Sequence, residues 1–240
     1  MQASHKSDTV NASYLRRSQI YRWHERSGAT FEALADGLVV AAYSSEEQEH
    51  SLAQMAGLAD LSLVPRLGFK GPKSLEWLRS QDVPIPDAAN RAVTLDDGGW
   101  VARLSAEEFL LLGTLDGASE TVERLSGSIL SPSEKVYDLP RADSHCWFAL
   151  TGEHGAEVLS KICGVDMRSE SFELGSIAQT SLARVNAIIL RDKAGETPVF
   201  HILSDVSIAE YLWACFLDAI TEFEGGAIGM RVFQQLSVRP

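Results

Sequence analysis

The sequence predicts an α+β domain in which one unit, strand, helix, strand, strand, helix (βαββα), occurs twice. Two observations carry this prediction. An amphipathic helix pattern over 207–226 follows two apolar runs, and the same order of patterns occurs roughly 80 to 90 residues earlier in the chain. Such a repeat indicates a pseudo-twofold molecule built from two interlocked lobes. The alternative is a chance recurrence of common elements.

The second copy ends in the clearest helix pattern of the chain. Apolar residues recur at three- and four-residue spacing from Ile208 to Phe223, behind a capping-box pattern of Ser207 and Glu210. Gly225–Gly226 can supply the left-handed residue that ends the helix. The other elements expected in this copy are strands at 146–150, 182–190 and 198–203, a helix at 154–162 and a hairpin loop at 191–197.

The first copy has the same order of patterns. It comprises a strand at 66–70, a helix after Gly71–Pro72, a hairpin of 100–104 with 109–113, and a helix at 118–125. Upstream, 28–43 predicts a short hairpin about Asp36–Gly37, and 45–56 predicts a polar helix. We expect residues 14–240 to form a single domain with lobes at about 57–130 and 140–226, preceded by a mobile polar arm over 1–13.

Composition and charge argue against several classes of protein. A net charge of −12 disfavours nucleic acid as a partner, because little here would neutralise a run of phosphates. The 3 cysteines are far apart without a C-x-x-C pair, and the histidines show no paired spacing, so neither a disulfide framework nor a metal site is expected. No apolar run reaches the roughly 20 residues that span a bilayer, and the N-terminus lacks a signal-peptide core. We therefore expect a cytoplasmic protein with no membrane association.

Asp96 and Asp97 are the sharpest candidates for chemistry. They are adjacent carboxylates at the entrance to a strand, next to Gly98–Gly99, where a ligand can approach the backbone. A carboxylate there can accept a hydrogen bond from an amine-bearing ligand or act as a general base. Because neighbouring strand side chains point to opposite faces, at most one of the pair would enter a given pocket. The alternative is an ordinary hydrophilic turn.

Three further residues are candidates for ligand contacts. Glu196 is a carboxylate in the hairpin loop of the second copy, and Arg184 and Arg231 can contact an anionic ligand tail. For each of them the alternative is an ordinary solvated side chain. The sequence has no G-x-S-x-G, no G-x-G-x-x-G after a strand and no Walker loop, which argues against a bound dinucleotide or nucleotide.

Several of these stretches together resemble the folate-binding aminomethyltransferase superfamily, the group of the glycine-cleavage T-protein. The stretches are Tyr21–Ala29, Gly57–Ser62, Arg66–Leu67, Lys70–Pro72 and Arg103–Leu112. The second half is closer to one branch, the gamma subunit of heterotetrameric sarcosine oxidase. The stretches that resemble this branch are Phe148–Gly152, Ala156–Leu159, Lys161–Cys163, Thr180–Val185, Ser207–Trp213 and Glu222–Phe223. The run Ser207–Trp213 is the most specific of them.

The resemblance implies an α+β fold with a central folate cavity, without the C-terminal barrel of the T-protein. It implies tetrahydrofolate, or a one-carbon adduct of it, as the ligand. The resemblance places the carboxylate of the T-protein at the pair Asp96–Asp97, with a shift of one residue. It places the Gly-Glu motif of the T-protein at Gly195–Glu196. The Tyr-Thr before that Gly-Glu and the Asp-Gly after it are missing here, which indicates weakened folate contacts or a subunit without catalysis. Folate contacts are thus expected at Asp97 and Glu196, with Arg184 and Arg231 at the anionic tail.

We interpret the chain as an accessory, gamma-type subunit of a tetrahydrofolate-linked, flavin-dependent amine oxidase complex. Such a complex demethylates N-methylated amino acids such as sarcosine, and the flavin is expected on a partner subunit, not on this chain. Two alternatives stay open. One is a self-sufficient folate-dependent aminomethyl or methyl transferase, with Asp96 or Asp97 as the positioning carboxylate. The other is a folate-binding protein that catalyses no reaction.

Overall fold

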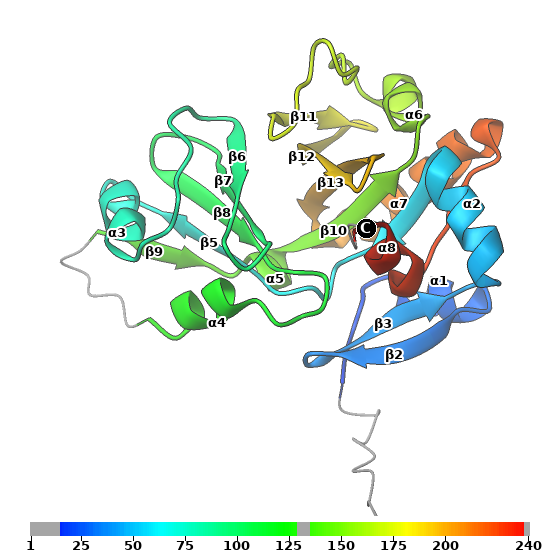
Figure 1. The fold of residues 1–240 in the computed structure, drawn as a ribbon, viewed down its shortest axis with the longest axis horizontal. Helices are drawn as coiled ribbons and strands as arrows, with labels where there is room; N and C mark the ends of the chain where they lie inside the picture. The colour runs from blue at the N-terminus through cyan, green and yellow to red at the C-terminus, as the bar shows by residue number, and fades with distance from the viewer. Residues whose placement is uncertain (1–14, 129–134, 238–240) are drawn as a thin grey trace, which may run out of the picture.

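The computed structural model describes residues 15–128 and 135–237, and its mixed architecture confirms the predicted α+β class. The expected mobile arm over 1–13 lies outside the described residues. Figure 1 shows two sheets with helices on their outer sides, and a third, smaller sheet near the N-terminus. The short helix α8 lies between these parts, close to β10.

The first lobe is built on a five-stranded antiparallel sheet in the order β6-β7-β8-β5-β9. Its strands are β5 (Arg66–Lys70), β6 (Arg91–Thr94), β7 (Trp100–Arg103), β8 (Glu108–Leu112) and β9 (Tyr137–Leu139). Helices α3 (Ser74–Ser80) and α4 (Glu120–Ser126) bury Leu78, Val122 and Leu125 in one cluster with Phe69 and Phe109. The predicted hairpin of 100–104 with 109–113 is present as β7 and β8.

The second lobe is built on a six-stranded sheet in the order β11-β12-β13-β10-β4-β14. Its strands are β4 (Gly57–Asp60), β10 (His145–Thr151), β11 (Ile177–Leu182), β12 (Val185–Ala194), β13 (Thr197–Asp205) and β14 (Gly226–Ala227). Helices α6 (Gly155–Ile162) and α7 (Ala209–Ile220) pack on its outer face, where Val158, Leu212 and Phe216 are fully buried. A strand that is covered on both faces has a nearly continuous apolar sequence, and the central strands of this sheet have such sequences.

The two copies of the repeat correspond element by element, with one more strand in each copy than the sequence indicated. The elements β5, α3, β6, β7, β8 and α4 match β10, α6, β11, β12, β13 and α7 in order. The extra strands are β6 and β11. In the second copy the apolar pattern over 182–190 runs across a tight turn at Ala183 and Arg184, whose φ angles are 47° and 68°. Residues other than glycine rarely adopt positive φ angles, so the sequence at Ala183 and Arg184 does not indicate a turn.

The hairpin of β12 and β13 is longer than predicted. Its loop is not the whole of 191–197 but the two residues Gly195–Glu196, because Ala194 still pairs with Thr197. Gly195 has a φ of 60°, as the first residue of a two-residue hairpin turn requires. The extension brings Asp192 into the sheet, where it is paired with Val199.

The start and end of α7 differ from the predicted capping box. Asp205 is the capping residue, because its Oδ1 accepts hydrogen bonds from the Ser207 backbone N–H at 2.8 Å and from the Ser207 hydroxyl at 2.6 Å. Ser207 lies in a short 3-10 turn, Val206–Ile208, and α7 begins after it. At the other end the left-handed residue is Glu224, with a φ of 51°, rather than a glycine.

Each lobe receives one strand from the chain segment that precedes the other lobe. β4 precedes the first copy in sequence yet pairs with β10 of the second lobe, whereas β9 precedes the second copy yet pairs with β5 of the first. The chain therefore crosses between the sheets twice, at 61–65 and at 140–144. We call these segments the two crossings. The second crossing contains the short helix α5 (Arg141–Ser144).

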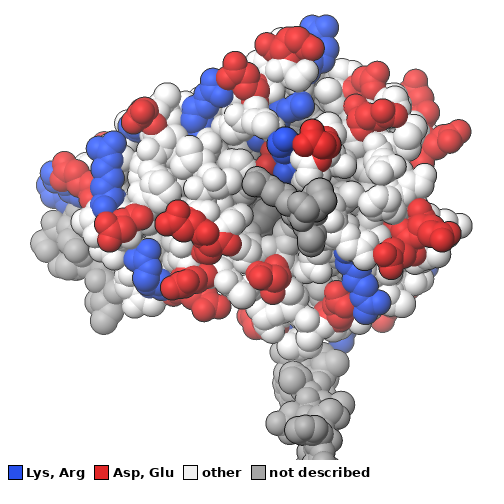
Figure 2. Space-filling model, viewed as in Figure 1, with Lys and Arg blue, Asp and Glu red and all other residues white. Residues whose placement is uncertain are grey.

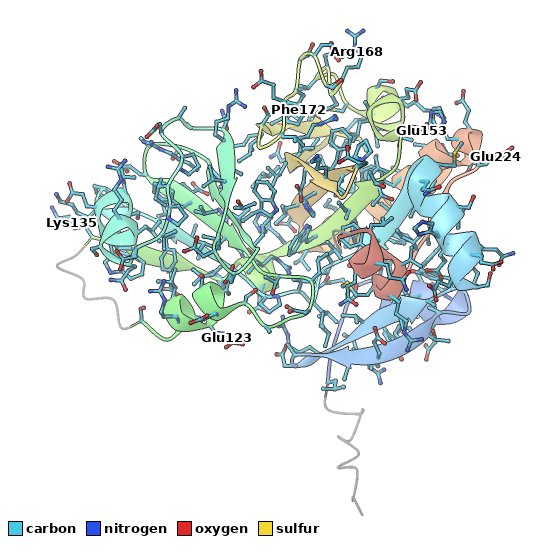
Figure 3. The ribbon with its side chains drawn as sticks, in the orientation of Figure 1. Glu123, Lys135, Glu153, Arg168, Phe172 and Glu224 are labelled. Carbon is cyan, nitrogen blue, oxygen red and sulfur yellow. The ribbon has the colours of Figure 1, made fainter. Side chains whose placement is uncertain are left out.

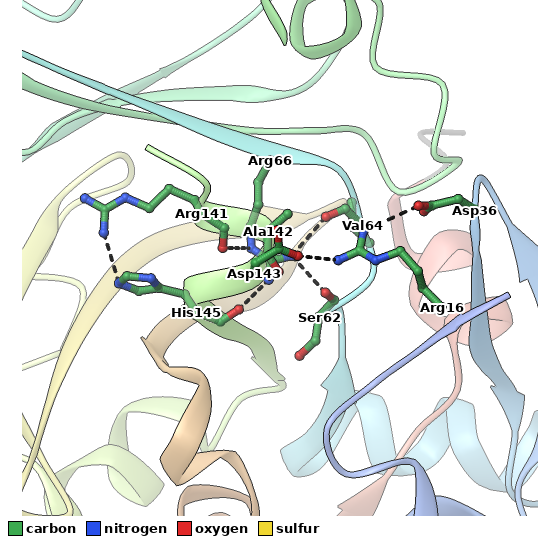
Figure 4. Close-up of polar contacts among 9 residues, drawn as sticks. All are labelled: Arg16, Asp36, Ser62, Val64, Arg66, Arg141, Ala142, Asp143 and His145. Atoms are coloured by element: carbon green, nitrogen blue, oxygen red, sulfur yellow. Dashed lines mark hydrogen bonds and ion pairs between the residues drawn. The ribbon is translucent and has the colours of Figure 1, made fainter. Parts of the chain in front are cut away.

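Arg66, at the start of β5, joins the two crossings (Figure 4). All of its N–H groups donate to backbone carbonyl oxygens. The acceptors are Ser62 at 2.9 Å and Val64 at 3.0 Å on the first side, Arg141 and Ala142 both at 3.1 Å on the second, and His145 at the start of β10. A guanidinium has five N–H donors in a fixed fork, so its donor capacity is filled. Burial lowers the pKa of Arg66 to about 10.

The N-terminal part adds a small sheet and two helices to the second lobe. Strands β1 (Arg16–Arg17), β3 (Gly37–Ala42) and β2 (Thr30–Leu34) form the sheet in that order, with helices α1 (Tyr21–Arg26) and α2 (Glu46–Ala56) beside it. The predicted hairpin about Asp36–Gly37 is thus present. The predicted polar helix is present as α2, with Ser45 as its N-cap.

Most charged side chains of the described residues lie on the outside of the molecule; Glu49, Asp60 and Arg66 are buried. On the face seen in Figure 2, acidic and basic side chains are interspersed, and the basic ones form no continuous patch among the described residues. Figure 3 shows Glu123, Arg168 and Glu224 at the periphery. Phe172, from the same loop as Arg168, is buried and fastens that loop to the core of the second lobe.

Candidate ligand cavity

A cavity of about 1160 Å³ lies where the two lobes and α8 (Met230–Ser237) meet. The first lobe contributes the turn between β6 and β7 and the loop that follows β8. The second lobe contributes the tip of the β12–β13 hairpin and the side chains of Trp147 and His201, and α8 contributes Phe233 and Gln234. Cavities that bind small molecules have about 300–1,000 Å³, with mostly apolar walls and a few polar groups. This cavity is large enough for such a ligand.

Asp97 lines the cavity from the β6–β7 turn. Its Oδ1 accepts the backbone N–H of Gly99 at 3.0 Å, and its Oδ2 accepts that of Thr121, in the first turn of α4, at 2.9 Å. Partial burial raises the pKa of Asp97, but these hydrogen bonds outweigh it and hold the pKa below its usual value. Asp97 is therefore ionised at neutral pH, and the side chain of Thr121 is a further hydrogen-bond partner of its carboxylate.

The other predicted residues have different positions. Asp96 is exposed on the same turn and does not line the cavity. Glu196 lines the mouth of the cavity at the tip of the β12–β13 hairpin, where its 97% exposed side chain lies 3.4 Å from Lys193. The structure thus brings Asp97 of the first lobe and Glu196 of the second lobe to one cavity, although their two turns do not correspond in the repeat.

Neither predicted arginine lines this cavity. Arg184 is exposed beside a second, more open hollow of about 800 Å³, next to Ser181 and Asn186. Arg231 points outward from α8 and pairs with Glu32 of β2 at 2.9 Å. The cation that does line the main cavity is Lys193.

Sequence reasoning missed a chain of four side chains in the cavity wall. Trp147 of β10 donates its indole N–H to Nδ1 of His201 at 3.2 Å, and Nε2 of His201 lies 3.2 Å from Oδ2 of Asp192. The same Asp192 oxygen accepts the indole N–H of Trp100, from the first lobe, at 3.2 Å. The loop predicted at 191–197 includes Asp192, so the sequence gives no sign that its side chain faces β13. In the structure β12 continues to Ala194, and the alternation of its side chains places Asp192 on the same face as His201.

Helix α8 closes one side of the cavity and is held from both lobes. The buried carboxylate of Glu49, on α2, accepts the backbone N–H of Gly229 at 2.7 Å, just before the helix begins. Gln234 donates its side-chain N–H to the carbonyl of Leu115, in the first lobe, at 2.8 Å. Met230, Val232 and Leu236 are buried in the core between the sheets. The helix is therefore an integral wall of the cavity.

The described residues contain neither a candidate metal site nor a candidate membrane span. Within 15–128 and 135–237, no three His, Cys, Asp or Glu side chains are grouped so that they could hold a metal ion. Across the same residues, no helix is both long and apolar enough to cross a membrane.

The fold and the cavity define a class of protein, a pseudo-twofold α+β domain that encloses a small-molecule cavity between its lobes. Within this class, the chain belongs to the family described as the GCVT N-terminal domain, whose model matches residues 20–238. Members of this family bind tetrahydrofolate. The family assignment agrees with the predicted resemblance to the T-protein superfamily.

Two aminomethyltransferases are similar in sequence. The protein from Saccharopolyspora erythraea is 21% identical over 219 residues, and that from Streptomyces coelicolor is 23% identical over 222 residues. The alignments cover 86% and 88% of this chain, but only 59% of each relative. The chain thus spans about three fifths of the length of these curated relatives.

Solved structures show the same fold. Aminomethyltransferase T of the glycine cleavage system from Bartonella henselae matches with a TM-score of 0.72 at 19% identity, covering 93% of this chain and 62% of that one. A chain of heterotetrameric sarcosine oxidase from Corynebacterium sp. U-96, in a complex with pyrrole 2-carboxylate, matches with a TM-score of 0.62 at 22% identity. That match covers 88% of this chain and 97% of the sarcosine oxidase chain.

Proposed function

We propose that the cavity between the lobes binds tetrahydrofolate. The observation that carries the proposal is the meeting of Asp97 from the first lobe and Glu196 from the second at one cavity in a chain of this family. The walls also suit the ligand. Trp100, which is half-buried, offers aromatic surface for a flat ring system, and the carboxylates offer acceptors for its N–H groups. Tetrahydrofolate, when bound, supplies nitrogen atoms that take up a one-carbon unit.

The roles of the chain's own residues follow from their bonding. Asp97 is fixed by two backbone N–H groups and lines the cavity as a carboxylate, so it can orient a ligand amine without moving. Lys193 is the cation at the cavity for the anionic tail of the ligand, a position that the sequence had assigned to Arg184 and Arg231. Its ion pair with Glu196 is exposed and hence weak, so the tail can displace it.

We propose further that the chain is an accessory subunit of a flavin-dependent amine oxidase complex that demethylates N-methylated amino acids such as sarcosine. The shared fold with a chain of heterotetrameric sarcosine oxidase, at a TM-score of 0.62, supports this proposal. The missing Tyr-Thr and Asp-Gly neighbours of Gly195–Glu196 support a subunit whose own catalysis is reduced. The flavin is proposed to lie on a partner subunit.

The folate proposal is tested by calorimetric titration of a stable reduced folate, 5-formyltetrahydrofolate, into the purified chain. We expect saturable binding that weakens about tenfold or more in Asp97→Asn, because a good charge-assisted hydrogen bond contributes about 1.5–3 kcal/mol. Asp96→Asn is the matched control, since it makes the same change one residue away, outside the cavity. No binding by the wild-type chain would refute the proposal.

The subunit proposal is tested by purifying the native complex. A flavin spectrum and oxidation of sarcosine in a complex that contains this chain are expected. A chain that purifies alone, without a flavin-bearing partner, would refute the proposal.

A self-sufficient folate-dependent aminomethyl or methyl transferase is the second candidate. The two curated aminomethyltransferases and the TM-score of 0.72 to aminomethyltransferase T favour it. Turnover of a methylated or aminomethylated donor by the isolated chain with tetrahydrofolate would select this candidate. Folate binding with neither turnover nor a partner would instead indicate a non-catalytic folate-binding protein.

A further inference from the structure

The side-chain series Trp147–His201–Asp192–Trp100, which we call the cavity relay, crosses from one lobe to the other. Trp147, His201 and Asp192 belong to the three adjacent strands β10, β13 and β12 of the second lobe, and Trp100 begins β7 of the first. His201 pairs with Leu190 in the sheet, so Asp192 is its diagonal neighbour on the same face. All four residues line the cavity.

The bonding of the relay fixes where the proton of His201 lies. An indole N–H can only donate, so Nδ1 of His201, 3.2 Å from the Trp147 nitrogen, accepts and carries no proton. The proton of a neutral imidazole is then on Nε2, from which it is donated to Asp192. Protonation of Nδ1 would break the bond to Trp147 and place two N–H groups face to face in a site where His201 is only 4% exposed. His201 is thus held as an uncharged donor.

An uncharged His201 leaves the negative charge of Asp192 without a cationic partner in the relay. Two neutral donors share its Oδ2, and its Oδ1 accepts the backbone N–H of Lys193 at 2.7 Å, which leaves one lone pair on Oδ1. The other charged side chains around the cavity are Asp97, Asp116, Glu196 and Lys193, and the last two are paired with each other. From β10 and α8 only uncharged side chains line the cavity, including Trp147 and Gln234. The interior is therefore negative.

We propose that Asp192 is a specificity-determining carboxylate of the cavity, which receives the cationic or N–H-rich end of a ligand, and that Trp147 fixes the tautomer of His201 that donates to Asp192. His201 acts as a positioning residue, because it orients Asp192 rather than exchanging a proton with the ligand. The inference rests on the proposed function in one respect: the N–H-rich end would be the aminopyrimidine ring of a reduced folate. An anionic tail would be repelled from this end of the cavity and would lie toward Lys193.

The first test uses no ligand. Nitrogen NMR of histidine-labelled protein reports which imidazole nitrogen carries a proton, and His201→Gln identifies the signals of His201. At pH 8 we expect Nδ1 of His201 in the wild-type chain to be unprotonated and Nε2 to be protonated. In Trp147→Phe, Nδ1 has lost its donor, and its signal is expected to move. A protonated Nδ1 in the wild-type chain at pH 8 would overturn the inference.

Trp100→Phe is the matched control. It removes an indole from the other end of the same relay but leaves the bond between Trp147 and His201, so its histidine signals should follow those of the wild type. Circular dichroism checks that both variants fold. If Trp147→Phe does not fold, the wild-type signals and those of Trp100→Phe still decide the protonation state.

The second test is calorimetric titration with 5-formyltetrahydrofolate at pH 8 and pH 5.5. Asp192→Asn should bind at least about tenfold more weakly than the wild type at both values. Trp147→Phe should bind more weakly than the wild type, because the imidazole of His201 is then no longer fixed as a donor to Asp192. Asp116→Asn, whose carboxylate bonds only within its own loop, should bind like the wild type.

The outcomes separate this inference from the proposed function. If the wild type binds the folate and Asp192→Asn binds it equally well, the assignment of Asp192 is wrong and folate binding stands. If the wild type does not bind the folate, the proposed function is wrong, and the ligand role of Asp192 is wrong with it. The NMR result decides the protonation state of His201 in either case.

Discussion

Asp60 is the residue on which the packing of the N-terminal segment depends most. Its side chain is 3% exposed, and its carboxylate accepts hydrogen bonds from the Ser18 hydroxyl, from Nε2 of His24 at 2.9 Å and from the Ser62 backbone N–H at 2.9 Å. The hydroxyl of Tyr43 lies 2.6 Å from the other ring nitrogen of His24. Burial raises the pKa of Asp60, but its bonds to His24 and the two serines outweigh burial and hold the pKa below its usual value.

Asp60→Asn is expected to destabilise the chain by about 1–3 kcal/mol or more at pH 7, because an amide leaves at least one of the three donors around this buried position without its charged acceptor. Because the folded-state pKa of Asp60 is lowered, its contribution is fully present above pH 3.8, its ordinary pKa, and is lost as the pH falls through the folded-state pKa. The measurement is urea denaturation of both proteins at pH 7 and at acidic pH, where the difference should shrink.

Asp36→Asn is the control for this prediction. Asp36 also faces a cation, Arg16 at 3.6 Å, but its side chain is 65% exposed, so the same change should alter the free energy of unfolding by less than about 1 kcal/mol. Equal effects of the two substitutions would contradict the assigned role of Asp60.

Among the elements, α8 shows how a short helix is held in place by a residue far away in sequence. The side chain of Glu49 is fully buried and accepts three backbone N–H groups, those of Tyr43, Ser44 and Gly229. The first two fix the entry to α2, and the third fixes the chain before α8. Since α8 carries Phe233 and Gln234 into the cavity, Glu49 links the N-terminal part to the shape of the cavity.

Glu49→Gln is expected to loosen α8. A glutamine keeps one oxygen acceptor but turns an NH₂ group toward backbone N–H donors, which should lower the free energy of unfolding by about 1–3 kcal/mol. Hydrogen exchange of the α8 amides should accelerate. Glu46→Gln is the control, because Glu46 contacts Gln235 of the same helix from the surface, at 2.9 Å. Unchanged exchange of α8 in Glu49→Gln would show that the apolar face of the helix holds it alone.

For the whole molecule, the exchange of β4 and β9 makes each lobe depend on the other. The sheet of the second lobe includes β4, which precedes the first copy, and the sheet of the first lobe includes β9, which precedes the second copy. Arg66 donates hydrogen bonds to both crossings (Figure 4). The edges of the sheets also meet, since the N–H of Ala92 donates to the carbonyl of Gly175 at 2.7 Å. We therefore expect the lobes to unfold together.

Arg66→Met is expected to remove this coupling. The methionine fills part of the space but leaves the carbonyl oxygens of both crossings without their donors, which should destabilise the chain by about 3 kcal/mol or more. The unfolding transition, followed by tryptophan fluorescence and by circular dichroism, should broaden, or its two probes should separate. Arg66→Lys, with three donors, should lie between the wild type and Arg66→Met. A single sharp transition at the wild-type midpoint in Arg66→Met would contradict this role.

The sequence by itself determined the α+β class, the repeat and most of its helices and strands. These features depend on local periodicity and on the alternation of side chains along a strand, which a single segment contains in full. The sequence left open whether Asp96 or Asp97 enters the cavity. The extra strands β6 and β11 were missed because their segments are short or run through a turn without glycine.

Only the tertiary structure decided which strand lies beside which, and hence what lines the cavity. The exchange of β4 and β9, the five carbonyl partners of Arg66, and the placement of Arg184 and Arg231 away from the cavity all depend on contacts between distant segments. The same holds for the relay, whose members Trp100 and Asp192 are 92 residues apart. A periodic pattern states which face of an element is buried, whereas its partner is chosen by the packing of the whole chain.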